Sequence, residues 1–179
     1  MPSILWRRLD REGHDFCSLD GTRLGGVALI EHDGAPCRIR YEVECDATWR
    51  TRWTQVHGFV GERAVDVAIT ADEDGTWRLN GAEVDSVAEC VDVDLNFSPS
   101  TNTLPIRRLQ LAVGEEAEVR AAWLRFPSFE LEPLVQRYRR LDEFTYHYES
   151  GTFSAEVQVN NAGLVTTYEG FCEMAAQTT

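Results

Sequence analysis

Long stretches of the chain alternate between apolar and polar residues with a period of two. In the clearest run, at 38–46, polar residues alternate with Ile39, Tyr41, Val43 and Cys45. Successive side chains of a strand point to opposite faces, so this pattern predicts a strand with one buried face and makes Cys45 a small core residue. Shorter runs of the same kind occur at 65–69, 119–123 and 153–159.

Dipeptides that favour tight turns separate many of these runs. They are Asp20-Gly21, Asp33-Gly34, Asp74-Gly75, Asn80-Gly81 and Ser150-Gly151. Such pairs supply the positive φ values of hairpin turns. Their spacing, roughly ten residues over much of the chain, is typical of an antiparallel sandwich, barrel or roll. Because no linker, charge block or internal repeat interrupts the pattern, we predict one all-β domain over residues 1–179 with little helix.

One segment, 131–141, fits two periods equally well. Helical spacing relates Leu131, Leu134, Val135, Tyr138 and Leu141, with Pro133 near the start. A strand would instead place Phe129, Leu131, Pro133 and Val135 on one face. Periodicity alone leaves helix and strand open here.

Composition narrows the classes of partner. The net charge of the 179-residue chain is −13, and all 17 basic residues are Arg, a usage typical of high-GC bacterial genes. So acidic a protein is repelled by nucleic acid and by anionic lipid headgroups. The hydrophobic content of 43% indicates a folded globule. The sequence therefore predicts neither a nucleic-acid partner nor a disordered chain, and it leaves the oligomeric state open.

The cysteines and the apolar runs bear on the compartment. The five cysteines are scattered without a Cys-x-x-Cys pair, which predicts reduced thiols and no structural zinc site. The apolar run near the N-terminus is shorter than a signal-peptide core, and no run approaches the length of a transmembrane helix. We therefore expect a cytoplasmic protein.

The most chemically informative stretch lies between residues 92 and 109. Asp92 and Asp94 alternate with apolar residues, so a strand would turn both carboxylates to one face. Pro99 and Pro105 disfavour a regular ladder, which predicts that the ladder stops near Ser98, that it does not resume before Ile106 and that a fixed crossing loop lies between.

Arg107 and Arg108 follow this predicted loop and balance the two carboxylates in charge. The cluster is either a ligand site or a structural lock of ion pairs. Structural ion pairs perturb charges without doing chemistry, which favours the lock. We predict that Asp92 or Asp94 pairs with Arg107 or Arg108.

An acid–base role for Asp92 and Asp94 is the alternative with most chemical content. Residues two apart on a strand have Cα atoms about 6.5–7 Å apart, which overlaps the spacing of roughly 6.5–9.5 Å between inverting glycosidase carboxylates. Any Asp-x-Asp strand passes this test, and adjacent arginines would keep the carboxylates ionised. We therefore assign no catalytic residue.

Other chemistries lack a motif. The run from Asp92 begins like a calcium loop but has Phe97 where Gly is needed and Thr103 where Glu belongs. The chain contains no Gly-x-Ser-x-Gly elbow and no Gly-rich loop followed by Lys. The sequence accordingly predicts no metal and no cofactor.

Aromatic residues suggest where a ligand could lie. If 49–59 is a strand, His57 shares a face with Trp49, Thr51, Trp53, Gln55 and Phe59. Rings with polar tips suit a ligand that is partly apolar and partly hydroxylated. Each ring taken singly is more often an ordinary core or surface residue.

The chain resembles the bacterial putative glycolipid-binding family, first described as a domain of unknown function. The resemblance rests on Cys90-x-Asp92-Val93-Asp94-Leu95, followed by Pro99-x-Thr101-Asn102-Thr103-Leu104-Pro105-Ile106-Arg107-Arg108-Leu109. It continues in Trp6, Tyr41, Asp46-x-x-Trp49-x-Thr51-Arg52, Gly75-x-Trp77, Asn80-Gly81, Gln136-x-Tyr138 and Gly163-Leu164-Val165-x-x-Tyr168. Family members often have Thr-Pro at Ser98-Pro99 and Tyr-Pro-Gly at Tyr168-Glu169-Gly170; neither departure touches the Asp/Arg cluster.

The resemblance implies a single-domain spiral β-roll, distantly similar to the half-barrels of bacterial lipoprotein carriers, and favours a strand at 131–141. The family name rests on that fold similarity, so the function it implies is an analogy. We expect non-catalytic binding of an amphipathic molecule, such as a glycolipid, in a groove or cavity of a barrel-like roll. The alternatives are an enzyme acting on a glycan or lipid headgroup through Asp92 or Asp94, and a protein-interaction scaffold.

The ligand-binding residues that this hypothesis names fall into two groups. The apolar and stacking wall would consist of Trp49, Trp53, His57 and Trp77. The polar mouth, or crossing lock, would consist of Asp92, Asp94, Asn102, Arg107 and Arg108.

Overall fold

The alternating runs form the strands of one fifteen-stranded sheet in the computed structural model, which describes residues 1–179. The strands of the first half are β1 (Ser3–Arg8), β2 (Gly13–Asp20), β3 (Arg23–His32), β4 (Ala35–Cys45), β5 (Thr51–Val60), β6 (Arg63–Ala71), β7 (Trp77–Leu79) and β8 (Ala82–Glu83). The second half contains β9 (Asp92–Leu95), β10 (Glu116–Leu124), β11 (Leu131–Arg140), β12 (Thr145–Ser150), β13 (Phe153–Val159), β14 (Val165–Tyr168) and β15 (Cys172–Thr178). The helical elements are the 3₁₀ turns η1 (Asp85–Val87) and η2 (Pro99–Asn102) and the helix α1 (Thr103–Leu109).

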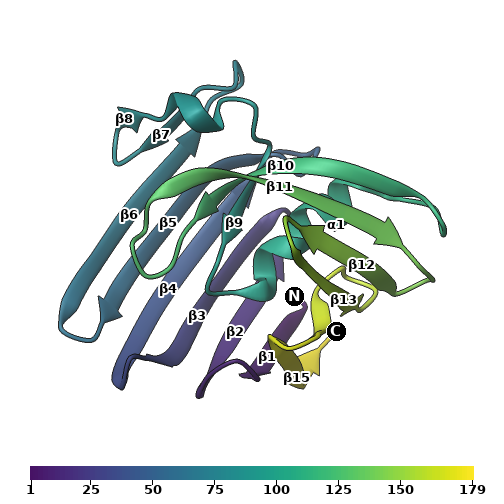
Figure 1. The fold of residues 1–179 in the computed structure, drawn as a ribbon, viewed down its shortest axis with the longest axis horizontal. Coiled ribbons are helices and arrows are strands. Elements are labelled where there is room, and N and C mark those ends of the chain that lie inside the picture. The colour runs from purple at the N-terminus through teal and green to yellow at the C-terminus, as the bar shows by residue number, and fades with distance from the viewer.

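The sheet is open and curls on itself. Its strand order is β8-β7-β6-β5-β4-β3-β2-β1-β15-β14-β13-β12-β11-β10-β9, and every neighbouring pair is antiparallel except β9 with β10. Because β1 pairs with β15, the two chain termini lie side by side (Figure 1). The start of β5 approaches the edge strand β9, where the Thr51 N–H donates to the Val91 carbonyl at 3.2 Å. The predicted all-β roll is confirmed, as an open spiral rather than a closed barrel.

The core occupies the concave face of this roll. On β4 the predicted inward residues Ile39, Tyr41, Val43 and Cys45 are all buried. All five cysteines are buried, and none forms a disulfide. The interior is therefore built as the alternation predicted.

No helix is long and apolar enough to cross a membrane.

The segment with two possible periods is a strand, as the resemblance implied. Residues 131–140 form β11, which pairs along its whole length with β10 and at 137–140 with β12. These two ladders satisfy its backbone groups and turn Gln136 and Tyr138 inward, where both are buried. Tertiary pairing thus decided a segment that local spacing left open.

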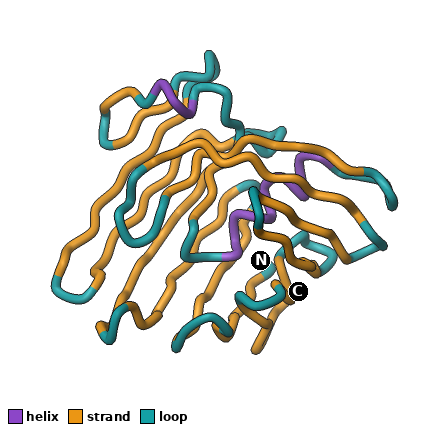
Figure 2. The backbone as a smooth tube through the Cα atoms, in the orientation of Figure 1, coloured by secondary structure: helices purple, strands orange, loops and turns teal.

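The segment between the two prolines is helical, whereas the sequence predicted a crossing loop. The ladder ends at Leu95, before Ser98 as expected, but η2 and α1 follow directly. Pro99 opens η2 and Pro105 lies in the first turn of α1, where a helix leaves its N–H groups without intrahelical partners. The Ser98 hydroxyl caps η2 by accepting from Ser100 N–H. Figure 2 shows this helical segment inside the roll, and its residues 99–106 are buried.

Candidate functional site

A cleft of about 430 Å³ opens on the concave side of the second half of the sheet. Seven aromatic residues line it, namely Phe97, Trp123, Phe126, Tyr148, Phe153, Tyr168 and Phe171. Its polar lining consists of Asp10, Arg11, Asp94, Asn96, Ser98, Asn102 and Ser150. This volume falls within the range of small-molecule pockets, roughly 300–1,000 Å³, and the lining combines apolar walls with an equally large set of polar groups.

Strand register brings these residues together from distant parts of the chain. Trp123 of β10 lies opposite Asp94 of β9, and Ser150 of β12 lies opposite Phe153 of β13. Directly paired residues project from the same face of a sheet. The parallel pairing of β9 with β10 therefore places a carboxylate beside an indole on the inner face.

Four of the aromatic rings form a continuous cluster around Tyr168. Ring centroids lie 5.9 Å apart for Tyr148 and Tyr168, 6.3 Å for Phe153 and Tyr168, and 5.2 Å for Tyr168 and Phe171. Tilted and edge-to-face pairs at these distances are favourable. The cluster supplies a rigid wall with hydroxyl groups on two of its rings.

Asp94 is the carboxylate at the floor of the cleft. Gln136 Nε2 donates to its Oδ2 at 2.5 Å, and its other oxygen accepts no hydrogen bond within the protein. Burial raises the pKa of Asp94 to about 6, although the bond from Gln136 opposes the shift. The Asp94 charge adds to burial in raising the pKa values of Tyr148 and Tyr168, so it acts directly on the aromatic wall.

Asp92, two residues earlier, is engaged in a buried ion pair. Arg108 donates through Nε to Oδ1 at 3.2 Å and through Nη2 to Oδ2 at 2.5 Å. The Asp92 side chain is 2% exposed and that of Arg108 is 18% exposed. Burial raises the pKa of Asp92, an effect that Arg108 opposes. The prediction that one of the two carboxylates pairs with Arg107 or Arg108 is confirmed.

A second buried carboxylate, Asp15, was missed by the sequence analysis. It is fully buried on the inner face of β2, where it accepts hydrogen bonds from the hydroxyls of Ser98 and Tyr41. Burial raises its pKa to about 7, while the bond from Ser98 and the charge of Arg8 oppose the rise. The signal in the sequence is an acidic residue in register with Cys17 and Leu19. Asp15 ties β2 to the start of η2, at the edge of the cleft.

The predicted aromatic wall does not form a single surface. Trp49 is buried beneath Arg107, whose guanidinium carbon lies 5.0 Å from the ring centroid. Trp77 is buried in the core and donates its indole N–H to the Cys90 carbonyl at 3.2 Å. Trp53 and the exposed His57 lie on the outer face of the sheet. Trp49 and Trp77 are therefore buried at different places, whereas Trp53 and His57 share the outer face of β5.

The shared face predicted for residues 49–59 is confirmed for Trp53, Gln55, His57 and Phe59, and a bulge explains why it is wrong for Thr51. Glu44 pairs with Trp53 but Cys45 pairs with Thr51, so Arg52 is an extra residue in β5. Thr51 is buried, whereas Trp53 and His57 lie on the other side. Trp49 precedes the strand and has a left-handed backbone, with φ of 67°.

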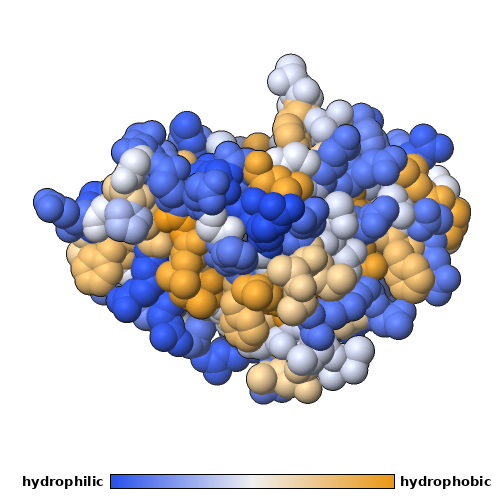
Figure 3. Space-filling view, turned by 90° about the horizontal axis from the view of Figure 1, so that it is seen from below, coloured by the Kyte–Doolittle hydropathy of each residue, from blue (hydrophilic) through white to orange (hydrophobic).

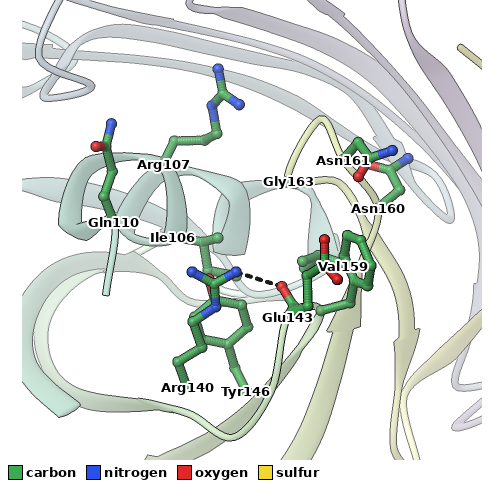
Figure 4. Close-up of a pocket in the computed structure, with 11 residues that line it drawn as sticks. Ile106, Arg107, Gln110, Arg140, Glu143, Tyr146, Val159, Asn160, Asn161 and Gly163 are labelled. Atoms are coloured by element: carbon green, nitrogen blue, oxygen red, sulfur yellow. Dashed lines mark hydrogen bonds between the residues drawn. The ribbon is translucent and has the colours of Figure 1, made fainter. Parts of the chain in front are cut away.

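The remaining predicted residues divide between the cleft and a second hollow. Asn102 lines the cleft and donates to the Tyr138 hydroxyl at 2.8 Å. Arg107 lines a second hollow of about 520 Å³, shown in Figure 4, together with Arg140. Arg140 donates to three backbone carbonyls, and the Arg107 guanidinium points away from it (Figure 4). The second hollow thus offers no convergent pair of cations.

The comparisons with known proteins agree with this architecture. A family model described as putative glycolipid-binding matches residues 3–174. The chain belongs to this family. A crystal structure of a DUF1089 family protein from Pseudomonas aeruginosa is similar, with a TM-score of 0.81 and 33% identity over 89% of this chain and 90% of that chain. No curated protein matches.

The family match covers the whole cleft. Its lining residues run from Asp10 to Phe171, inside the matched range. Several residues on which the resemblance to the family rests belong to the buried ion pair or to the cleft. They include Asp92 and Arg108 of the buried pair, together with Asp94 and Asn102 of the cleft.

Proposed function

We propose that this protein binds an amphipathic ligand of the glycolipid class in the cleft between β9–β14 and the β1–β2 turn, without converting it chemically. The observation that carries the proposal is the lining of this cleft, in which the Tyr168 ring cluster faces a carboxylate and several amides and hydroxyls. Aromatic faces pack on sugar rings and acyl chains, while carboxylates and amides bind hydroxyl groups. The family description supports the same class of ligand.

The state of the two aspartates favours binding over catalysis. An acid–base pair needs two carboxyl groups free to exchange protons with a substrate. Both oxygens of Asp92 are bound by Arg108, and Asp92 does not line the cleft. Asp10, the other carboxylate of the cleft, is paired with Arg8 and Arg11. Asp94 therefore has no partner for an acid–base mechanism.

Calorimetric titration with octyl β-D-glucopyranoside, kept below its micelle concentration, tests this proposal. The full chain should bind it, and Tyr168→Ala should weaken binding about three- to tenfold, because one stacking ring is lost. Phe59→Ala controls for the loss of an aromatic ring outside the cleft, since Phe59 lies on the outer face of β5 and is 45% exposed.

Equal affinity of the wild type and Tyr168→Ala would contradict the proposed site. Native mass spectrometry of protein purified from its own host should in addition show a co-purifying lipid. Turnover of a glycoside by the wild type that Asp94→Asn abolishes would favour the enzyme alternative.

A further inference from the structure

Asp94 is the carboxylate of the cleft that faces no cation. Its bonding partner in the protein is the neutral amide of Gln136. The groups that act on it or are acted on by it are Asp92 on its own strand, Tyr138 on β11, Tyr148 on β12 and Tyr168 on β14. None of these carries a positive charge. Even a half-buried carboxylate such as Asp94 is costly without a cation unless something else supplies the compensating charge.

The nearby arginines are already engaged. Arg108 holds both oxygens of Asp92, and its side chain is mostly buried in that contact. Arg11 lines the cleft but pairs with Asp10 at 3.0 Å, and its guanidinium carbon lies 5.4 Å from the Phe126 ring centroid. The protein therefore offers no spare cation to Asp94.

The surroundings of Asp94 favour a positively charged ligand group. Its second oxygen is free to accept, and the rings of Tyr148, Phe153 and Tyr168 stand beside it in the same cleft. Aromatic faces attract ammonium groups, and the net charge of −13 attracts cations at long range. The same negative charge repels an anionic headgroup.

We propose that the cleft selects a sugar headgroup that carries a protonated amine, whose N–H groups donate to Asp94 while the ring packs against the tyrosine wall. This inference rests on the proposed function and specifies the ligand of the same site. It assigns Asp94 the role of charge recognition and the aromatic residues the role of packing.

Matched probes test the charge requirement on the full chain at pH 7. They are octyl β-D-glucopyranoside, its 2-amino-2-deoxy and 6-amino-6-deoxy analogues, and the N-acetylated form of each amine. A charge-assisted hydrogen bond should make at least one amino probe about tenfold tighter than the neutral glucoside. Its N-acetyl form should lose that gain.

Two isosteric variants locate the effect. Asp94→Asn keeps the size of the side chain and should abolish the preference for the amine. Asp66→Asn is the control, because Asp66 also accepts from a glutamine amide, Gln55 Nε2 at 2.8 Å, but does so on the exposed outer face of the sheet. It should retain the full preference. Lowering the pH to 5 should reduce the wild-type preference, since the pKa of Asp94 is about 6.

The outcomes separate this inference from the proposed function. Equal affinity for amino and neutral probes, or a preference that survives in Asp94→Asn, overturns the amine requirement. If Tyr168→Ala still weakens all probes in that case, the cleft remains the binding site and the charge assignment alone fails. If no probe binds the wild type, both proposals fail.

Discussion

The two halves of the sheet use the same strand geometry for different interiors. The inner face of β2–β6 is filled and mostly aliphatic, with Leu24, Ile39, Val56 and Ile69 fully buried beside the polar groups of Asp15 and Tyr41. The inner face of β10–β14 carries tyrosines and polar groups and leaves a cleft. In Figure 1 the first half forms the broad wall of long strands, and β10 and β11 arch over the helical segment. Alternation decides which residues point inward, but residue type and pairing decide whether the inside is solid or hollow.

The helical segment marks the boundary between these interiors. The Arg108 side chain of α1 covers Asp92. Asp94, two residues further along β9, does not pair with Arg108 and lines the cleft. Two carboxylates on one strand thus have different surroundings, one bound by an arginine and one open to the cleft. The face of the molecule seen in Figure 3 is mixed, with apolar residues in separate groups among hydrophilic ones. The cleft distinguishes the second half of the sheet.

The largest effect should come from the ion pair at this boundary. Arg108→Ala leaves Asp92 buried and uncompensated, at a cost of about 3–5 kcal/mol. Thermal unfolding should then occur about 6–20 °C lower, since each kcal/mol shifts a domain of this size by about 2–4 °C. Adding Asp92→Asn should recover part of the loss. Arg107→Ala, which removes no ion pair, is the comparison, and an equal loss in both single variants would contradict the lock.

Truncating a side chain should cost much more stability in the filled half of the sheet than at the cleft. This difference should be nearly as large as the effect of Arg108→Ala. Ile39→Ala removes a fully buried side chain from the filled half and should cost about 2–5 kcal/mol in the free energy of unfolding. Phe153→Ala removes a ring that is 50% exposed at the cleft and should cost less than about 1 kcal/mol. Urea denaturation of both variants measures the difference. Similar losses of unfolding free energy in the two variants would show that Phe153 is packed like a core residue.

The pH dependence of stability should reveal Asp15. Its folded-state pKa of about 7 lies above the ordinary 3.8, so between these values the folded protein holds a proton that the unfolded chain has lost. The stabilisation is complete below pH 4 and disappears as the pH rises through 7. Asp15→Asn should therefore lose less thermal stability than the wild type between pH 5 and pH 8. Parallel pH profiles for the two proteins would contradict this assignment.

The smallest stability effect should come from filling the cleft. Leu134→Phe adds carbon atoms into open space and should shift the melting temperature by less than about 2 °C, while weakening binding of the octyl glucoside. Ala28→Leu adds bulk to a fully buried position of β3 and should cost about 1–3 kcal/mol by overpacking. Thermal unfolding of Leu134→Phe and Ala28→Leu measures this difference in stability. A large loss in Leu134→Phe would show that the position is already packed.

Much of the fold could be predicted from local patterns, whereas most of the site could not. The burial of Ile39, Tyr41 and Val43 followed from alternation, and the pairing of Asp92 with an arginine followed from charge balance. The aromatic lining was missed because Tyr148 and Phe153 occupy inward positions that look the same as core positions in the sequence. The bulge at Arg52 divided the predicted wall, because it places Thr51 on the opposite face from Trp53 and His57.

The sequence by itself determined the strands, their inward and outward faces and the hairpin turns, because side-chain direction and turn geometry depend on neighbouring residues. The tertiary structure alone decided the strand at 131–140, the buried helix between the two prolines and the separate environments of Asp92 and Asp94. These features depend on contacts between distant parts of the chain. Ser98 and Asp15 are 83 residues apart, and β9 pairs with β10 through a parallel crossover. No local pattern encodes such pairings, since their energy arises only when the roll closes around them.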